Sequence, residues 1–230
     1  MKMPNYLFFD TETTGLPTGE ASARVRPGVW PEIVSIAWIL TTDEGVVLSS
    51  EYHIVYPEAW VIPEDSIAIH KISQNMALRY GALLDDVMFR FLRDVDNADV
   101  LIAHNIRFDQ NVINNALKWR LGHNQLLEDK GKRLFCSMRY AKDLVGLPGK
   151  KPGTFKQPKL VEMYRQLFGA EPSEILHNAM GDTQVLMKCF FRLWGKDLPT
   201  EPVKQVENEA SPAPIVTKLV LSLNDPPETV

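Results

Sequence analysis

Runs of apolar residues predict three β-strands in the first quarter of the chain. Residues 5–12 are apolar up to a pair of acids, as expected for a buried strand. Residues 32–41 and 45–55 are rich in β-branched and aromatic side chains, and the polar turn Thr42–Gly45 between them predicts a hairpin. The Pro- and Gly-rich segment 17–31 is expected to be the loop that joins the first two strands.

The remainder of the pattern predicts helices that alternate with short strands. Apolar residues recur every three or four positions in four segments: 63–97, 107–121, 159–168 and 178–195. Short apolar runs at 100–103 and 134–138 predict two more strands, the second running into a helix. Strands followed by alternating helices and strands favour an α/β fold with helices packed on a mixed sheet.

Composition changes after Pro199 and predicts a domain boundary there. We expect one domain over residues 1–198 and a Pro-rich linker with a C-terminal tail over 199–230. The tail contains one isolated apolar segment, residues 215–223, which could dock to a protein partner by strand or helix addition. Folding back onto its own domain and lack of structure are the alternatives.

The overall composition is that of a globular protein outside the membrane. The 230 residues are 45% hydrophobic and 23% charged, and no apolar run approaches the roughly 20 residues of a membrane span. The first residues reach an acidic pair too early for a signal peptide, so a cytoplasmic location is expected. A net charge of −4 does not favour a polyanionic partner, although bound cations would neutralise a cluster of carboxylates.

Asp10 and Glu12 are the first candidates for chemistry. They stand two positions apart on the predicted strand, so both side chains leave the same face. Gly15 and Pro17 follow directly and place the acids at the carboxyl end of the strand, where open α/β sheets bind ligands. Two carboxylates this close repel each other unless cations lie between them, and oxygen ligands suit Mg²⁺ or Mn²⁺. A solvated acidic turn is the alternative.

Two further acids occur on apolar helix faces. Asp109 and Asp182 are each followed by apolar residues at i+3, i+4 and i+7, which places both side chains on the core-facing stripes of their helices. A buried carboxylate without a partner is costly, and a bound cation removes that cost. Gly181 is expected to permit close approach to the sheet. His177 lies five residues before Asp182, so we expect it on the turn before the helix, where an imidazole can accept a proton from water.

Taken together, these motifs resemble the DnaQ-like (DEDDh) 3′→5′ exonuclease family, which includes the proofreading epsilon subunits. The first motif is FDTETTGL at residues 9–16, the second combines AHN at 103–105 with Phe108-Asp109, and the third is HNAMGD at 177–182. The family's I-H-G-I loop is matched by IHKI at 69–72, where lysine replaces the small residue. The resemblance implies a ribonuclease H-like fold with a five-stranded sheet of order 3-2-1-4-5.

The resemblance also implies roles for the individual residues. Two Mg²⁺ or Mn²⁺ ions would be held by four carboxylates: Asp10, Glu12, Asp109 and Asp182. His177 would be the general base. The pocket for the 3′-terminal nucleotide would be lined by five residues: Thr13, Leu16, His70, Asn105 and Phe108. Phosphate contacts or plain surface charge are the two interpretations of a basic set: Lys130, Lys132, Arg133, Arg139, Lys142, Lys150, Lys151, Lys156 and Lys159.

The expected substrate is a single-stranded or frayed nucleic-acid 3′ end. DNA proofreading or repair is the first hypothesis, because the form D-T-E-T-T-G is common in DNA-directed relatives. RNA trimming is the alternative within the same chemistry. A non-catalytic, polymerase-associated binding subunit is disfavoured, because degenerate members lose an acid and all four are present.

Overall fold

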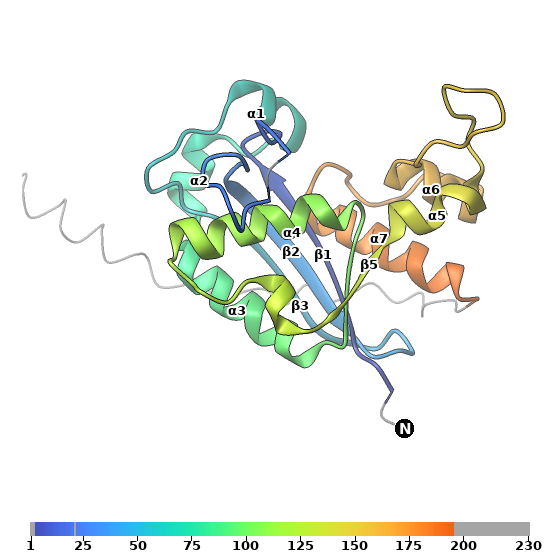
Figure 1. The fold of residues 1–230 in the computed structure, drawn as a ribbon, viewed down its shortest axis with the longest axis horizontal. Coiled ribbons are helices and arrows are strands. Elements are labelled where there is room, and N and C mark those ends of the chain that lie inside the picture. Colours follow the sequence, from blue (N-terminus) through green and yellow to red (C-terminus); the bar gives the residue numbers. More distant parts are fainter. Residues whose placement is uncertain (1–2, 21, 196–230) are drawn as a thin grey trace, which may run out of the picture.

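A five-stranded mixed sheet forms the centre of the molecule (Figure 1). The computed structural model describes residues 3–20 and 22–195. The strands are β1 (Tyr6–Thr13), β2 (Ile33–Thr41), β3 (Val47–Ile54), β4 (Val100–Ala103) and β5 (Arg133–Cys136), and they lie in the order β3-β2-β1-β4-β5. This confirms the predicted order and the predicted hairpin, because β2 and β3 pair antiparallel.

The direction of the strands brings three carboxyl ends to one edge. β1 pairs antiparallel with β2 but parallel with β4, and β4 pairs parallel with β5. β2 is buried at every position because helices cover both faces of the sheet. The chain therefore leaves β1, β4 and β5 on the same side, and each of these exits leads towards the loops and helix starts that form the site.

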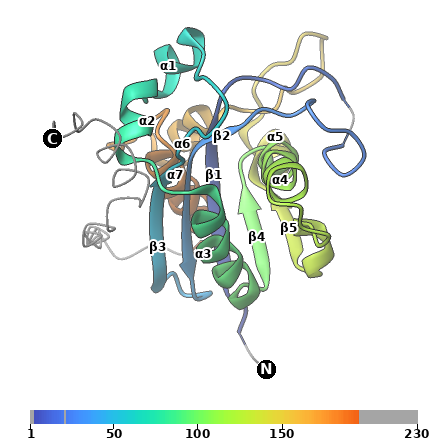
Figure 2. The same ribbon diagram turned by 90° about the vertical axis from the view of Figure 1, so that its left-hand side faces the viewer.

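Helices α3 (Leu84–Asn97) and α4 (Ile106–Asn115) cover one face of the sheet, as Figure 2 shows. The core on this face includes Phe9 and Trp38 from the strands and Phe91 from α3. Phe91 meets both rings edge-on, at centroid distances of 5.6 and 5.4 Å. The predicted helix 107–121 ends differently from expectation, since α4 continues as a π-helical turn over Ala116–Arg120.

Helix α7 (Ala179–Leu193) covers the other face, with α5 (Ser137–Val145) and α6 (Leu160–Phe168) beside it. Alternate residues of β1 divide between the two cores, so Phe8 packs against Phe190 and Phe191 of α7. The strand's two-residue period thereby sends Asp10 and Glu12 to the α7 face and Thr11 to the α4 face.

The helical pattern predicted over 63–97 is interrupted twice. It forms α1 (Glu64–His70), α2 (Gln74–Tyr80) and α3. Lys71 ends α1 in the left-handed conformation at φ 64°. Gly81 ends α2 where a side chain would not fit, because a Cβ there would lie 2.4 Å from the Ala77 carbonyl oxygen. Apolar periodicity continues across both breaks, which is why the pattern alone did not reveal them.

The predicted linker and tail, residues 199–230, lie outside the described residues, as does the apolar segment 215–223. Within the described part of the chain, every helix is too short or too polar to cross a lipid bilayer.

Candidate metal and nucleic-acid site

The end of β1 presents Asp10 and Glu12 beside small neighbours. Asp10 lies opposite Ala37 and Glu12 lies opposite Ser35 on β2. These small side chains leave space in front of the two carboxylates on the α7 face. The strand pairing shifts register between Glu12 and Thr13, and β1 ends at Thr13, so the two acids lie at the carboxyl end of the strand as predicted.

The first turn of α7 brings Asp182 to the same place. Side-chain oxygens of Asp10, Glu12 and Asp182 all lie within 4.8 Å of one another. The three side chains are half-buried, which leaves them accessible to ions from solvent. Residues at least 170 positions apart in sequence are therefore joined into one acidic cluster by the packing of α7 on β1.

Asp109 approaches from the opposite face of the sheet. A tight turn at Asn105, with φ 74°, sends the chain from β4 directly into α4. Asp109 is 2% exposed, as its helical spacing predicted. Its Oδ1 accepts hydrogen bonds from the Thr11 backbone N–H at 3.1 Å and from the Thr11 hydroxyl at 2.7 Å. Thr11 thus holds one oxygen of Asp109 with two hydrogen bonds.

The four carboxylates destabilise one another's charged forms. Burial, followed by the charges of its three neighbours, raises the pKa of Asp10 well above its usual range. Burial and the charges of Asp182 and Asp109 raise the pKa of Glu12 to about 7. Burial also raises the pKa of Asp109 to about 7 and that of Asp182 to about 6. Such a cluster needs positive charge to ionise fully at neutral pH.

The donor set fits divalent metal ions. Every ligand atom is a carboxylate oxygen, which is the chemistry that Mg²⁺ and Mn²⁺ prefer. No lysine or arginine contributes to the pKa shifts of Asp10, Glu12 or Asp182 among the residues described. The residues present therefore suit a bound cation better than an internal ion pair.

His177 lies on the turn that leads into α7, as its spacing predicted. It precedes the N-cap residue Asn178, has a left-handed φ of 59°, and its imidazole is exposed. The backbone N–H of His177 donates to Oδ2 of Asp182 at 3.0 Å. The turn is therefore fastened to Asp182 through its backbone, while the imidazole ring is exposed.

Gly181 permits a close approach, but to the loop before His177 and not to the sheet as expected. A Cβ on Gly181 would lie 2.0 Å from the Ile175 carbonyl oxygen. The absent side chain thus lets the loop fold over the first turn of α7. This contact helps to set the path of the chain into His177.

Two of the predicted nucleotide-pocket residues lie together. His70, at the end of α1, is 4% exposed, and its Nδ1 accepts from the Ile72 N–H at 3.1 Å. Its Nε2 is buried towards the Thr13 carbonyl without closing a regular hydrogen bond. Thr13 is buried and donates its hydroxyl to the Gly15 carbonyl at 2.7 Å. Burial lowers the pKa of His70, which favours the neutral ring.

The other three predicted pocket residues are placed less tightly. Leu16 is 82% exposed on the loop after β1. Asn105 is exposed at the start of α4 and makes no side-chain cap there. Phe108 is half-buried and meets the ring of Trp30 edge-on at 5.9 Å. Leu16 and Asn105 therefore present their side chains to solvent near the acids instead of forming a closed pocket.

Two residues to which the sequence assigned no role belong to the surroundings of the site. Tyr52 on β3 pairs with Ala37, which itself pairs with Asp10, so the three lie in one row across the sheet. Burial raises the pKa of the Tyr52 phenol, and the charge of Glu12 raises it further. Only the register of the hairpin could have shown that Tyr52 lies in this row.

His104 is the second such residue. Its Nδ1 lies 2.9 Å from the Ser137 hydroxyl and its Nε2 lies 3.0 Å from the Pro158 carbonyl oxygen. Since a carbonyl can only accept, Nε2 carries the hydrogen and Nδ1 is the acceptor. Burial lowers the pKa of His104 to about 4. The neutral ring thereby ties the start of α5 to the loop before α6.

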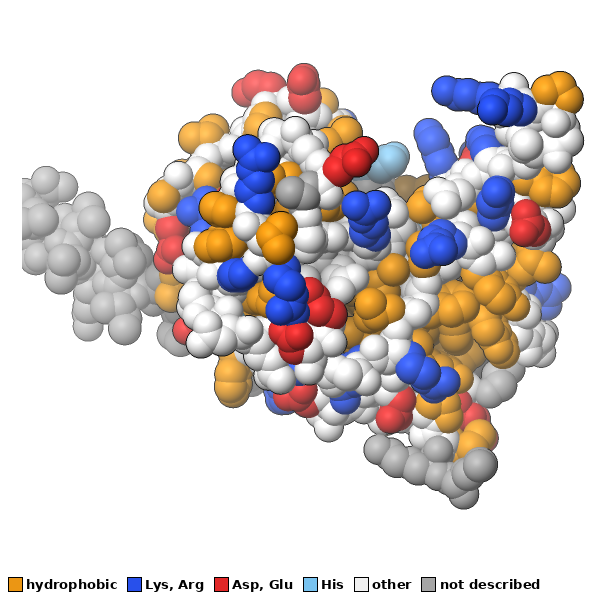
Figure 3. Space-filling view, viewed as in Figure 1, with side chains coloured by type: hydrophobic (Ala, Val, Ile, Leu, Met, Phe, Trp, Pro, Cys, Tyr) orange, Lys and Arg blue, Asp and Glu red, His pale blue; other side chains and the backbone are white. Residues whose placement is uncertain are grey.

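The basic residues divide into two groups. Lys130 binds the Asp96 carboxylate at 3.0 Å, and Lys132 donates to the Asp96 carbonyl at 2.9 Å. Both lie before β5, at the end of the sheet away from the acids, so they are structural contacts. Lys150 and Lys151 are exposed in the loop 146–159. Figure 3 shows Lys and Arg side chains on this projecting loop and around the hollow beside it.

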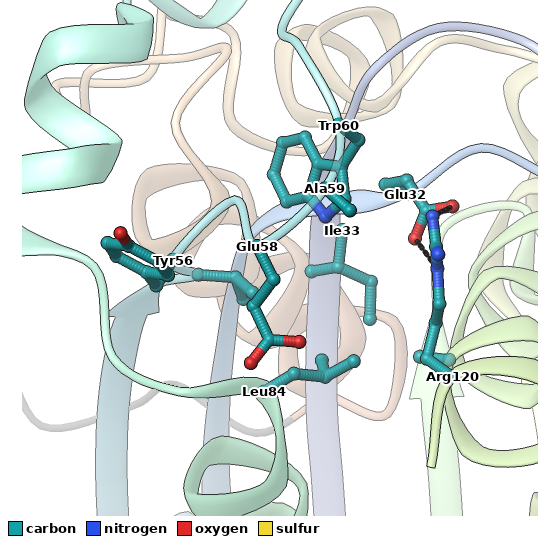
Figure 4. A pocket seen from close by; sticks show the side chains of 10 residues that line it. Glu32, Ile33, Tyr56, Glu58, Ala59, Trp60, Leu84 and Arg120 are labelled. Atoms are coloured by element: carbon teal, nitrogen blue, oxygen red, sulfur yellow. Dashed lines mark hydrogen bonds and ion pairs between the residues drawn. The ribbon is translucent and has the colours of Figure 1, made fainter. Parts of the chain in front are cut away.

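A small pocket lies apart from the acids, between the start of β2 and the π-helical turn that follows α4 (Figure 4). Its volume is about 50 Å³, and Trp60 and Leu84 form part of its wall. Arg120 holds Glu32 with two hydrogen bonds of 2.9 and 2.5 Å. The Glu32 backbone in turn pairs with Thr14, so this ion pair braces the loop after β1.

Comparison with known proteins agrees with this geometry. A family model described as an exonuclease of the RNase T type matches residues 7–190. The fold is similar to exonuclease X in complex with 5′-overhanging duplex DNA, at 21% identity and a TM-score of 0.54, covering 83% of this chain and 91% of that chain. No curated protein matches the sequence.

Exonuclease I has a similar fold over part of its length. The complex of E. coli exonuclease I with a dT13 oligonucleotide matches at 17% identity and a TM-score of 0.63, covering 83% of this chain and 40% of that chain. The zinc-bound complex of E. coli exonuclease I with single-stranded DNA matches at 17% identity and a TM-score of 0.58, covering 81% and 39%. This chain therefore spans less than half of exonuclease I.

Proposed function

The chain belongs to the DnaQ-like 3′→5′ exonuclease family, and on that premise we propose that it removes nucleoside 5′-monophosphates from single-stranded or frayed DNA ends. The observation that carries the proposal is the cluster of Asp10, Glu12 and Asp182, whose oxygens lie within 4.8 Å of one another. With Asp109 bound to Thr11 beside them, they would hold two Mg²⁺ or Mn²⁺ ions.

The bound ions would supply an activated water and neutralise charge on the phosphate. The chain's own residues do the rest. His177 accepts a proton from the attacking water, whose oxygen forms a new bond to phosphorus while the bond to the 3′-oxygen of the preceding nucleotide breaks. That oxygen leaves with a proton from solvent. Thr13 and His70 border the position of the terminal nucleotide, and exposed Leu16 is available to contact its base.

DNA is the favoured substrate because the similar exonuclease X and exonuclease I structures hold DNA. An unstacked strand end also suits a site whose rim carries exposed apolar side chains, since bases can be gripped without sequence preference. Residues Lys150 and Lys151 on the projecting loop would contact the phosphates. The second candidate is an exoribonuclease, which the RNase T name of the matching family favours.

Degradation of end-labelled oligonucleotides tests the proposal. Single-stranded DNA and RNA of matched sequence, labelled at the 5′ end, should shorten stepwise from the 3′ end with Mg²⁺ and not with EDTA. We expect DNA to be degraded at least tenfold faster. Asp10→Asn and Asp182→Asn should each abolish shortening, and activity retained in both variants would refute the metal assignment. Faster RNA degradation would favour the second candidate.

The role of His177 is tested separately from metal binding. His177→Ala should lower kcat by about 10²–10⁴-fold, the usual contribution of a general base. Calorimetric titration with Mn²⁺ should show nearly unchanged affinity, because the Asp182 contact uses the backbone N–H and survives the substitution. Loss of metal binding in His177→Ala would instead make the imidazole a ligand.

A further inference from the structure

An exposed apolar patch lies where α5, β5 and α7 meet; it comprises Phe135, Tyr140, Leu144 and Trp194. Trp194 stacks on Tyr140 at 5.2 Å and meets Phe135 edge-on at 5.4 Å. Tyr140, Leu144 and Trp194 are nevertheless 48, 59 and 45% exposed. Figure 3 shows hydrophobic side chains gathered on this side of the molecule. A contiguous cluster of this kind on a folded domain marks a contact surface.

The patch borders an open edge of the sheet. β5 is the outermost strand and pairs with β4 alone among the described strands. An outer strand leaves one row of backbone N–H and C=O groups free to pair with an added strand. Apolar side chains and free backbone groups thus occur side by side, which is the combination that binds an extended apolar segment.

We propose that the occupant is residues 215–223 of the same chain. This segment, IVTKLVLSL, lies outside the described residues. In an extended conformation Leu219, Leu221 and Leu223 share one face, while the opposite face alternates Val216 and Val220 with Lys218 and Ser222. The leucine face covers the patch, and the mixed face with Lys218 points away from it.

The point at which the chain leaves the domain supports this occupant. α7 ends at Leu193, and the next residue, Trp194, is itself part of the patch. Nineteen residues lie between Gly195 and Ile215, and a flexible linker of that length spans about 25 Å on average. The domain has a radius of gyration of about 16 Å for its size. The segment is therefore held near the patch at an effective concentration in the millimolar range, well above that of a second copy.

The charge of the linker that precedes the segment also favours docking on the patch. Residues 199–214 carry three glutamates, at 201, 207 and 209, and one lysine, at 204, for a net charge of −2. Arg133 and Arg139 flank the patch with exposed side chains. An acidic linker that passes between these arginines gains favourable electrostatics as it leads the apolar segment onto the patch.

Hydrogen exchange of the full-length protein, followed by mass spectrometry, tests the docking. Residues 215–223 should exchange at least tenfold more slowly than an unstructured peptide. Leu144→Asp on the patch and the double variant Leu219→Asp with Leu221→Asp should each remove this protection. Lys218→Asp changes the net charge as much as the double variant but lies on the face that points away from the patch, so protection should persist. Leu48→Asp, at a leucine that is 51% exposed on β3, is the matched control for Leu144→Asp.

Three results would overturn the proposal. They are exchange of 215–223 at the unprotected rate, protection that survives Leu144→Asp, and protection that grows with protein concentration, which would indicate a second copy. Nuclease activity should stay unchanged in all these variants and serves only to show that each is folded. The readout does not use catalysis, so the outcome is independent of the proposed function.

Discussion

Asp109→Asn should stabilise the metal-free protein while it abolishes activity. In the wild type, burial raises the pKa of Asp109 from 3.8 to about 7. A carboxylate whose pKa is higher in the folded state favours folding only while it is protonated. Its ionisation therefore costs stability as pH rises from about 4 to 7, and the full cost is present above pH 7. An asparagine keeps an oxygen that can accept both hydrogen bonds from Thr11 and removes the buried charge.

The size of the effect follows from the pKa. A difference of about 3 units corresponds to about 4 kcal/mol at pH 8 and to about 2 kcal/mol at pH 5. Neighbouring carboxylates also shift their protonation when Asp109 ionises, so the measured gain will be smaller. We expect about 2 kcal/mol at pH 8 and about 1 kcal/mol at pH 5. For a domain of this size the gain at pH 8 corresponds to a rise in Tm of about 4–8 °C.

Urea unfolding in EDTA at pH 5 and pH 8 measures this directly. Asp94→Asn is the control, because Asp94 is a buried acid with the opposite shift. Burial raises the pKa of Asp94, but hydrogen bonds from Ser49, Trp38 and Arg93 lower it overall. Asp94→Asn should therefore destabilise the protein at both pH values.

Saturating Mg²⁺ should stabilise the wild type, because the ions bind only the folded protein. The difference in unfolding free energy between the wild type and Asp109→Asn should therefore become smaller or change sign. If Asp109→Asn is no more stable than the wild type in EDTA at pH 8, the argument that buried charge strains this site is wrong.

Three further predictions follow from single contacts. Gly181→Ala should lower kcat at least about tenfold and destabilise the fold by about 1–3 kcal/mol, because the new Cβ would lie 2.0 Å from the Ile175 carbonyl oxygen. Steady-state kinetics measures the first effect and urea unfolding the second. Tyr52→Phe should lower kcat about tenfold with little loss of stability, since the phenol lies near the charge of Glu12, and unchanged kcat would contradict this. Burial lowers the pKa of His104 to about 4, so the unfolded chain takes up a proton at this residue more readily than the folded one. The stability present above pH 6.5 should therefore fall by about 3 kcal/mol as pH falls towards 4, measured as the free energy of unfolding. This loss should be absent in His104→Gln.

Local spacing was enough to predict the hairpin, the short strands and the burial of Asp109. These features depend on periods of two or about 3.6 residues, which a sequence displays directly. Breaks in the helical region did not follow from spacing. Lys71 and Gly81 end their helices through backbone conformation and close approach, and the apolar pattern continues past both. The strand order came from the resemblance to a family, since periodicity does not determine which strands pair.

The acids could be predicted as a set, but their arrangement around β1 could not. Asp10 and Glu12 face α7, whereas Thr11 between them faces α4 and holds Asp109. The carboxylates therefore lie on both sides of one strand: Asp10, Glu12 and Asp182 form the cluster on the α7 face, and Asp109 is bound to Thr11 on the α4 face. This requires that α4 and α7 begin at the same edge of the sheet, which only the topology provides.

The roles of Tyr52 and Gly181 also could not be predicted from the sequence. Tyr52 enters the site through two strand pairings, from Asp10 to Ala37 and from Ala37 to Tyr52, so its role depends on the register of a hairpin that the sequence predicts only approximately. Gly181 was expected to face the sheet, yet it accommodates the loop that carries His177. In both cases the residue reaches the site through a contact between two separate elements of the fold. Such contacts leave no periodic signal, because only the folded chain brings the two elements together.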